Sequence, residues 1–539
     1  MHCNTTNRAG DEIVADFIDR LRAEPFILRN EDTLRYVKRM CKEFPAASFH
    51  RSVMAVLGCD YSYARKDEQT GAWHAVMELN APLQLMLGLN SGIHITFTHY
   101  HELQSRTIEA MRSKEIERPR NDAIYLLYTK DIYAQRKLDD WTFRETYSVL
   151  TLSTGGSPND VAHDLLARIV AASARNNPYD RTTPVSGDEF FGRHETLRGL
   201  VTELRSGRVC GVFGLRKTGK TSLLSELGRL FVLGDPQGSL YVLQDLEVLP
   251  SATEQKIPQL ISDVANQLKI SFGKHGMRTH ELASITNLST VGDLRQAIGA
   301  SLRRGVGPTK SVVLALDEVE SLVGAETQTS EVQTGVPEFF GALRALVQEN
   351  SNFNVVLSGI TTAPIMYPTL YGRENPLFAW AKPTFLAEIS RSESDRMIQA
   401  LGSRMAARWT HDALSRVYIG TGGQVFLTRS LAGFVAAKLS NDIASREISG
   451  SLVQECFRQW RRTAVSLVDG MIDSLNRFYP HELSVVELGL ELPNFNELED
   501  DFSNEISNLI NLGVLIDNGR DIALAPWTQL GSKFRSKSR

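Results

Sequence analysis

The stretch 209–224, VCGVFGLRKTGKTSLL, holds the densest group of residues that could do chemistry. Gly214, Gly219, Lys220 and Thr221 fit the pattern G-x-x-x-x-G-K-[ST] in full. In such a loop, backbone N–H groups surround phosphate oxygens, the lysine adds positive charge and the hydroxyl binds Mg²⁺. A chance glycine turn is the alternative, and the flanking sequence argues against it. The pattern predicts that a nucleoside triphosphate contacts Gly214, Leu215, Arg216, Lys217, Thr218, Gly219, Lys220, Thr221 and Ser222.

A carboxylate pair, Asp317 and Glu318, stands at the end of a second apolar run, SVVLAL over 311–316. An unbroken apolar run is typical of a strand that is buried on both faces. An Asp at the end of such a strand can hold Mg²⁺, and the next Glu can orient and polarise an attacking water. We therefore expect ATP and Mg²⁺ as cofactors, Thr221 and Asp317 as metal ligands, and Lys220 and Glu318 as catalytic residues.

Alternating strands and helices must position these groups. The runs 209–213, 240–243, 311–316 and 354–357 predict strands, and leucines at helical spacing predict a helix over 221–230. This order implies a parallel sheet with helices on both faces and a ligand at the carboxyl ends of the strands. The predicted fold class is α/β, with a P-loop NTPase sheet as its core.

An FFGR box at 190–193, followed by Glu195 and a helix with apolar spacing, precedes the glycine loop. The box and the G-L-R-K-x-G-K-T-S-L-L loop together resemble the STAND ATPases, especially their archaeal-type ATPase branch. They are also similar to the origin-recognition and initiator ATPases of the AAA+ group. The resemblance implies that Phe191, Gly192 and Arg193 line the nucleotide pocket, whereas a helix start that only packs in the core is the alternative.

The same resemblance extends to the end of the strand at 354–357 and to the region after it. In these relatives a polar residue at that strand end contacts the γ-phosphate or the water; Ser358 and Thr361 are the candidates here, where an Asn or Arg is more usual. Arg373, in a G-R-x-x-P-L-F segment, is a candidate catalytic arginine finger, and an ordinary surface arginine is the alternative.

A helical lid is expected beyond that segment. Ser392 is expected to cap a helix over 392–406. Gly422 and Gly423 match the lid motif, but Gln424 or Val425 stands where the family has proline.

The C-terminal residues, 456–539, have the outline of a winged helix, with a long helix at about 456–477 and a hairpin turn at 517–520. Residues 441–539 carry 10 Lys and Arg against 15 Asp and Glu, and the presumed recognition helix, 502–512, has Glu505 and no basic residue. Because DNA binding depends on basic side chains that contact phosphates, a protein-contacting or autoinhibitory winged helix is favoured over a DNA-binding one. Arg520 and the basic tail at 531–539 are the exceptions.

The N-terminal region predicts a small α/β layer domain whose activity the sequence does not reveal. In HITFTHYH, His94, His99 and His101 could supply half of a metal site, with an ordinary polar strand end as the alternative. A restriction-type nuclease is disfavoured because no strand carries a Glu-x-Lys pair. The elements expected are two helices within 11–48, strands at 53–57, 93–98, 123–128 and 149–152, and helices at 102–111 and 161–172.

The composition is that of a soluble globular protein: 539 residues, 42% hydrophobic, formal net charge −4. The five cysteines are scattered without CxxC spacing, which fits a reduced, cytoplasmic setting without disulfides or zinc. No 18-residue apolar window suggests a membrane span. The expected domains are an N-terminal domain (1–175), a linker (176–188), the ATPase core (189–365), a helical lid (366–455) and the winged helix (456–539).

Taken together, these features predict an ATP-hydrolysing STAND-type switch that acts by self-assembly or on a protein partner. The resemblance implies a role in prokaryotic signalling or anti-phage defence, with the N-terminal domain as effector or sensor. The alternative is a DNA-binding initiator or transposition-type AAA+ ATPase that acts through its winged helix. A scaffold that binds nucleotide without turnover is disfavoured by intact Lys220, Thr221, Asp317 and Glu318.

Overall fold

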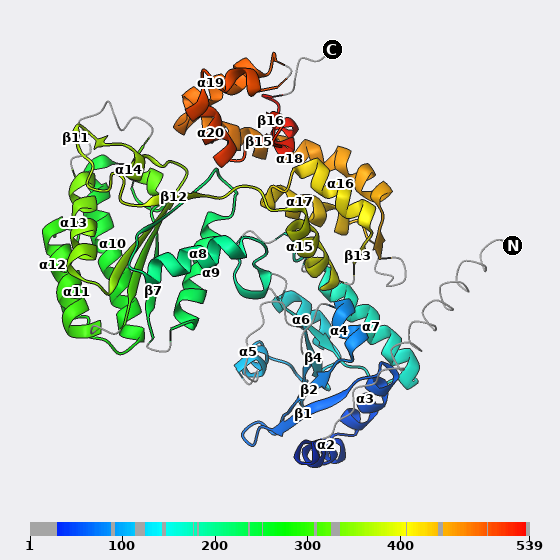
Figure 1. Ribbon diagram of the computed structural model, residues 1–539. Coiled ribbons are helices and arrows are strands. Elements are labelled where there is room, and N and C mark those ends of the chain that lie inside the picture. Colours follow the sequence, from blue (N-terminus) through cyan, green and yellow to red (C-terminus); the bar gives the residue numbers. More distant parts are fainter. Residues whose placement is uncertain are drawn as a thin grey trace. The chain divides into compact units, whose positions relative to one another are not determined.

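The chain forms two compact units (Figure 1). The computed structural model describes residues 30–87, 92–113, 124–142, 147–175, 177–180, 183–235, 238–250, 252–306, 310–324, 335–405, 407–439, 446–492 and 494–534. The first unit comprises residues 1–181, 395–416 and 429–456, and the second comprises 182–394, 417–428 and 457–539. The region expected to form the lid, 366–455, is therefore divided between them. No helix among the described residues is long and apolar enough to cross a membrane.

The first unit is built on a mixed sheet in the order β1-β2-β3-β4-β5. The pairs β1–β2 and β2–β3 are antiparallel, whereas β3–β4 and β4–β5 are parallel. One face packs against α2, α3 and α7, and the other packs against α5 and α6. The bounds are α2 Glu31–Glu43, α3 Pro45–Val56, β1 Asp60–Lys66, β2 Trp73–Glu78, α4 Ala81–Leu87, β3 Ile93–Phe97, α5 Arg106–Ser113, β4 Ile124–Tyr128, α6 Ala134–Thr142, β5 Ser148–Thr151 and α7 Pro158–Arg175.

The predicted strands at 93–98, 123–128 and 149–152 are confirmed as β3, β4 and β5. The strand expected at 53–57 is wrong, because those residues end α3, which Pro45 opens at its first turn. Its apolar residues bury one helical face rather than forming a strand. Of the two helices expected within 11–48, the second is α2, whereas the first, with Ile13, Phe17 and Leu21, lies outside the described residues.

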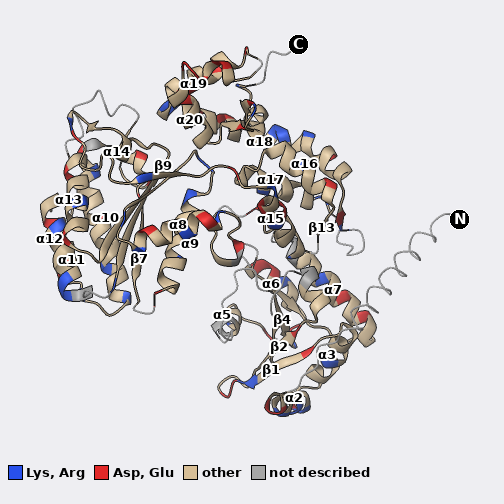
Figure 2. Cartoon of the chain, viewed as in Figure 1, with Lys and Arg blue, Asp and Glu red and all other residues tan. Residues whose placement is uncertain are grey.

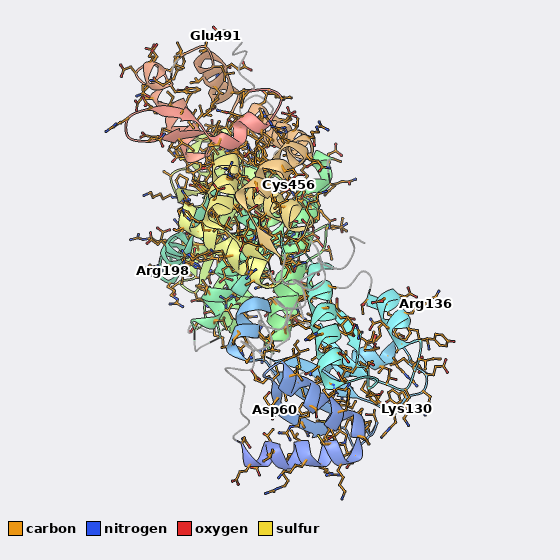
Figure 3. All side chains as sticks on the ribbon, turned by 90° about the vertical axis from the view of Figure 1, so that its right-hand side faces the viewer. Asp60, Lys130, Arg136, Arg198, Cys456 and Glu491 are labelled. Atoms are coloured by element: carbon orange, nitrogen blue, oxygen red, sulfur yellow. The ribbon has the colours of Figure 1, made fainter. Side chains whose placement is uncertain are left out.

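Two polar groups of the N-terminal region are held by local contacts. Asp60 begins β1 and forms a bidentate ion pair with Arg51, at 2.7 and 2.8 Å (Asp60 is labelled in Figure 3). His99 follows β3 and stacks on Phe44, with ring centroids 4.0 Å apart. Within the described ranges, no group of three or more His, Cys, Asp or Glu side chains is arranged to hold a metal.

The second unit is built on a wholly parallel sheet in the order β12-β6-β9-β8-β7. One face packs against α8 and α9, and the other packs against α10, α12 and α13. Every residue of β8 and β9 is buried, as strands covered on both faces require. The bounds are α8 His194–Arg205, β6 Cys210–Phe213, α9 Lys220–Leu233, β7 Leu240–Asp245, α10 Thr253–Lys274, α11 His280–Ala283, α12 Val291–Ser301, β8 Val312–Asp317, α13 Val336–Glu349, β9 Phe353–Gly359 and β12 Lys382–Phe385.

Smaller elements connect the core to the C-terminal region. They are α14 Ala363–Met366, β10 Thr369–Leu370, β11 Arg373–Glu374, α15 Arg391–Ser403, β13 Arg408–Trp409, α16 His411–Thr421, α17 Val425–Ala436 and β14 Glu447–Ile448. The cap of α15 is Ser390 and not the predicted Ser392, because Ser390 and Glu393 exchange side-chain-to-backbone hydrogen bonds as a capping box.

The long helix and the hairpin predicted for 456–539 are present. They are α18 Gly450–Phe478 and the antiparallel pair β15 Leu515–Asp517 and β16 Ile522–Leu524. Between α18 and the hairpin lie α19 Pro480–Gly489 and α20 Ser503–Asn511. The hairpin turn is closed by a hydrogen bond from the Gly519 amide to the Asp517 carboxylate, at 2.7 Å.

Candidate active site

The glycine loop connects β6 to α9 and is closed by its own contacts. The Thr218 hydroxyl donates to the Leu215 carbonyl at 2.8 Å. A Cβ atom on Gly214 would lie 2.9 Å from the Thr218 hydroxyl oxygen, so the close turn requires glycine there. Gly219 has φ +89° and precedes α9 without a side-chain cap, which leaves backbone N–H groups at this helix start for another acceptor.

Lys220 is folded onto the loop that it follows. Its side chain is 4% exposed, and its Nζ donates to the carbonyls of Gly214 at 3.2 Å and Leu215 at 3.3 Å. The ammonium is thus held beside the loop N–H groups. An anion that binds the loop would meet a positive charge already in position.

Asp317, at the end of β8, is hydrogen-bonded to residues at the start of α9 and near the end of β9. Its carboxylate accepts from the Thr221 hydroxyl at 2.7 Å, from the Ser358 hydroxyl at 2.8 Å and from the Glu318 amide at 3.1 Å. Burial raises the pKa of Asp317, while the hydroxyls of Thr221 and Ser358 and the charge of Lys220 oppose that rise. A hydroxyl and a carboxylate 2.7 Å apart are the hard oxygen donors that Mg²⁺ prefers, so Thr221 and Asp317 fit this ion.

Ser358 and Thr361 differ in where their hydroxyls are directed. Ser358, which is fully buried in β9, donates to Asp317. The Thr361 hydroxyl accepts from the Ala363 amide at 3.2 Å in the turn before α14. Of the two candidates at this strand end, the structure brings Ser358 to the carboxylate pair.

Glu318 has a left-handed backbone, φ +59° and ψ +47°, which non-glycine residues seldom adopt. Burial and the neighbouring Glu320 carboxyl raise its pKa to about 7, while the charges of Lys220 and Arg216 act in the opposite direction. Glu320 was not foreseen from the sequence. Its Oε2 accepts from the Ile360 amide at 3.0 Å, which ties the end of β8 to the end of β9.

The FFGR box contacts the loop through Arg193. Its guanidinium donates to the carbonyl of Thr218 at 2.5 Å and to that of Ala387 at 2.7 Å, and its amide donates to Glu393 at 3.0 Å. Burial lowers the pKa of Arg193 to about 10. Gly192 has φ +78° and Arg193 φ +58°, so the box makes a sharp turn before α8. Phe191 is half-buried beside this turn.

The remaining predicted residues lie at the margin of the site or away from it. The Ser222 hydroxyl accepts from the Val185 amide at 3.2 Å. Arg216 is exposed on the loop. Arg373, on β11, forms an ion pair with Glu338 of α13, and among the described contacts none links it to the loop.

Gln424 contacts the glycine loop, which the sequence did not reveal, although its departure from the expected proline marked the position. Its side chain donates to the Lys217 carbonyl of the loop at 2.9 Å.

The sheet order decides the fold. The strands of this sheet can be numbered 1 to 5 in chain order, from β6 through β7, β8 and β9 to β12. Their order across the sheet is then 5-1-4-3-2. The phosphate-loop motif follows the first strand, and Asp317 ends the third, next to the fourth with Ser358. This strand order, with a phosphate-loop motif after the first strand, is a P-loop NTPase fold. This core thus carries both the glycine loop and the carboxylate pair at the carboxyl ends of its strands.

Comparisons with known proteins find distant similarity to this chain. No protein-family model matches it. It is 22% identical over 281 residues to an uncharacterized WD repeat-containing protein of Synechocystis sp.. That match covers 50% of this chain, and the chain spans only 22% of the length of that relative.

Solved structures with similar features include a Walker-type ATPase of Pyrococcus abyssi (TM-score 0.49, 14% identity, 66% of this chain and 99% of that one). The ORC2 protein of Aeropyrum pernix superposes with a TM-score of 0.42 at 11% identity, and the match covers 66% of this chain and 94% of that one. The RuvB Holliday junction branch migration motor of Thermotoga maritima superposes with a TM-score of 0.32 at 15% identity, and the match covers 63% of this chain and 94% of that one. These superpositions are loose, and the fold assignment rests on the strand order and loop geometry described above.

Proposed function

We propose that this chain binds MgATP at the loop 214–221, hydrolyses it, and uses the nucleotide state as a STAND-type switch. The observation that carries the proposal is the hydrogen bond between Thr221 of the loop and Asp317 of the carboxylate pair, at 2.7 Å. It supports a single site in which phosphate, metal and water ligands converge. Either motif on its own would support less.

Each residue has a role that follows from its position. Loop N–H groups and Lys220 would bind the β- and γ-phosphates, with Lys220 exchanging its two carbonyl partners for phosphate oxygens. Thr221 and Asp317 would hold Mg²⁺, which neutralises developing charge on the phosphates when it is bound. Glu318 would orient the attacking water, and Ser358 would hold Asp317 in place.

The switch itself would be a shift between two arrangements of the C-terminal elements, driven by different affinities for nucleotide. Within the second unit, Trp527 donates to Glu388 at 3.1 Å, and Glu388 directly follows Ala387, whose carbonyl accepts from Arg193. A nucleotide-dependent change at the loop would therefore be felt near residues 387–388. We place the N-terminal domain as effector or sensor, with further copies of the chain or another protein in the cytoplasm as partner and signalling or anti-phage defence as the setting.

An initiator-type, DNA-binding function is the weaker alternative because the segment from α19 to β16 is acidic. Between 480 and 524, Arg520 is the one Lys or Arg against ten Asp and Glu (Figure 2). On α20, Asn508 donates to Glu482 of α19, and Glu505 is the charged residue of the first turn. Steep, salt-dependent binding to duplex DNA would contradict the protein-contact proposal.

Substitution of the loop lysine tests the nucleotide site. We expect Lys220→Ala to abolish MgATP binding, measured by calorimetric titration of the full chain, because the buried ammonium is lost from the loop. Retained affinity in Lys220→Ala would mean that the loop is not the site. Arg216→Ala, which removes an exposed charge from the same loop, is the comparison for a purely electrostatic effect.

A further inference from the structure

Two carbonyls of the phosphate loop are held by side chains that lie outside the loop. Arg193 donates to the Thr218 carbonyl at 2.5 Å, and Gln424 donates to the Lys217 carbonyl at 2.9 Å. Because a peptide unit is planar and trans, its C=O and the following N–H are directed oppositely. Holding the two carbonyls towards these donors therefore turns the amides of Thr218 and Gly219 away from them.

The Gln424 side chain uses both ends of its amide. Its Oε1 accepts from the Leu427 amide at 2.7 Å and thereby caps the start of α17, while its Nε2 donates to Lys217. The side chain is 3% exposed. Only this orientation of the amide satisfies both partners, since one is a donor and the other an acceptor.

Lys217 is also held through its side chain. Its Nζ lies 5.1 Å from the ring centroid of Phe426, two residues beyond Gln424, which is cation–π distance. Its backbone is left-handed, with φ +63°. The same short turn of the chain thus contacts both the carbonyl and the ammonium of a strained loop residue.

The turn that carries Gln424 is held against the segment that follows β12. Gly422 and Gly423 have φ of +62° and +77°, and a Cβ on Gly423 would lie 2.4 Å from the Ile389 carbonyl oxygen. The Ile389 amide donates to the Gly423 carbonyl at 3.0 Å. Ile389 follows β12, which pairs in parallel with β6, the strand that leads into the loop.

We propose that Gln424 is a positioning residue for the phosphate loop: its amide holds the Lys217 carbonyl and so presets the loop N–H groups for phosphate. The inference rests on the proposed function and adds to it the means by which the start of α17 controls affinity. When the turn 422–424 stays on the segment after β12, the loop is preset; when the turn leaves, the Lys217 peptide loses its donor and affinity falls.

The test compares MgATP affinity with stability in the full chain. Gln424→Glu keeps an acceptor for the Leu427 amide but replaces the donor to Lys217 with a carboxylate oxygen. Gln424→Met is close in size, uncharged and lacks both bonds. We expect both variants to raise the Kd for MgATP about tenfold, with the thermal midpoint of the nucleotide-free chain unchanged in at least one of them. Gln348→Glu, the same change on the exposed face of α13, should leave both quantities unchanged.

Two results would overturn the inference. One is wild-type affinity in both Gln424 variants while wild type binds MgATP and Lys220→Ala does not. The other is a loss of affinity that is accompanied in both variants by a lower thermal midpoint. That result would show that Gln424 has only a general structural role. If wild type itself fails to bind MgATP, or if Lys220→Ala binds as tightly, the proposed function fails instead.

Discussion

Glu318 combines an uncommon backbone conformation with a carboxyl that holds its proton near neutrality. Its backbone, at the end of β8, is left-handed with a φ of +59°. Burial, together with the neighbouring Glu320 carboxyl, raises the pKa of Glu318 to about 7. A general base or water-orienting group works best when its pKa lies close to the working pH. The environment of Glu318 therefore suits the role that we propose for it.

This protonation predicts a pH dependence of turnover. Below about pH 7 Glu318 is mostly protonated and cannot act as a base towards the attacking water, so kcat for ATP hydrolysis should rise as the pH increases through 7. Glu320→Gln removes one cause of the raised pKa of Glu318, so the acidic limb of the curve of kcat against pH should move to lower pH. A series of phosphate-release assays from pH 5.5 to about 9 measures both effects. An unchanged limb in Glu320→Gln would show that Glu320 does not act on Glu318.

At the scale of elements, close contact between β8 and β9 depends on Gly359. A Cβ atom at this position would lie 2.3 Å from Glu320 Oε2 and 2.8 Å from a Val319 side-chain carbon. Gly359→Ala should lower the free energy of unfolding by about 1–3 kcal/mol, because Val319 is fully buried and Glu320 Oε2 is held by the Ile360 amide. Urea unfolding of the nucleotide-free chain measures this change.

Gly199 on α8 provides the matched control. It is exposed, and no atom lies within 4 Å of a Cβ built there. Gly199→Ala should therefore stabilise the chain by about 0.5–1 kcal/mol through helix propensity. A destabilised Gly359→Ala beside a stabilised Gly199→Ala would isolate the steric cause, whereas equal effects would contradict it.

The parallel sheet could be predicted because its strands are continuous apolar runs that end in recognisable polar residues. The N-terminal sheet was harder. Its first strand, Asp60–Lys66, alternates polar with aromatic residues, and β2 begins with Trp73 and the polar His74, so neither stood out as an apolar run. Residues 53–57 were misassigned because a short apolar run does not distinguish a buried helix face from a strand.

The sequence also predicts only part of the candidate site, namely the residues that form local patterns. Lys220, Thr221, Asp317 and Glu318 form local patterns, so the sequence predicts them as candidate site residues. Contacts between distant segments, such as Gln424 with Lys217 or Glu320 with Ile360, depend on the tertiary fold and leave no local signal. Arg373 shows the converse, since a matching motif placed it near the site while the structure pairs it with Glu338.

At the scale of the second unit, Glu388 connects the C-terminal elements to the ATPase core. Its carboxylate accepts from the Trp527 indole at 3.1 Å, and the Arg193 charge lies near enough to lower its pKa in part. Burial prevails and raises the pKa of Glu388 to about 7 from 4.5. The folded chain therefore holds this proton more tightly than the unfolded chain does.

This linkage predicts how stability depends on pH. The contribution of Glu388 is fully present below about pH 4.5 and is lost as the pH rises through about 7. Glu388→Gln should raise the free energy of unfolding at pH 8 by up to about 3 kcal/mol and change it little at pH 4.5. Thermal unfolding at the two pH values measures the difference. Glu374→Gln, at an exposed position on β11, should show no such gain, and an equal gain there would contradict the account.

The central claim is that this P-loop fold hydrolyses ATP at the site formed by Thr221, Asp317 and Glu318. The most direct measurement is phosphate release from saturating MgATP by wild type and by Glu318→Gln, with nucleotide binding measured on the same samples. We predict steady turnover by wild type, and retained binding with turnover reduced at least about a hundredfold in Glu318→Gln. Near-wild-type turnover in Glu318→Gln, or no turnover by wild type despite binding, would contradict the claim.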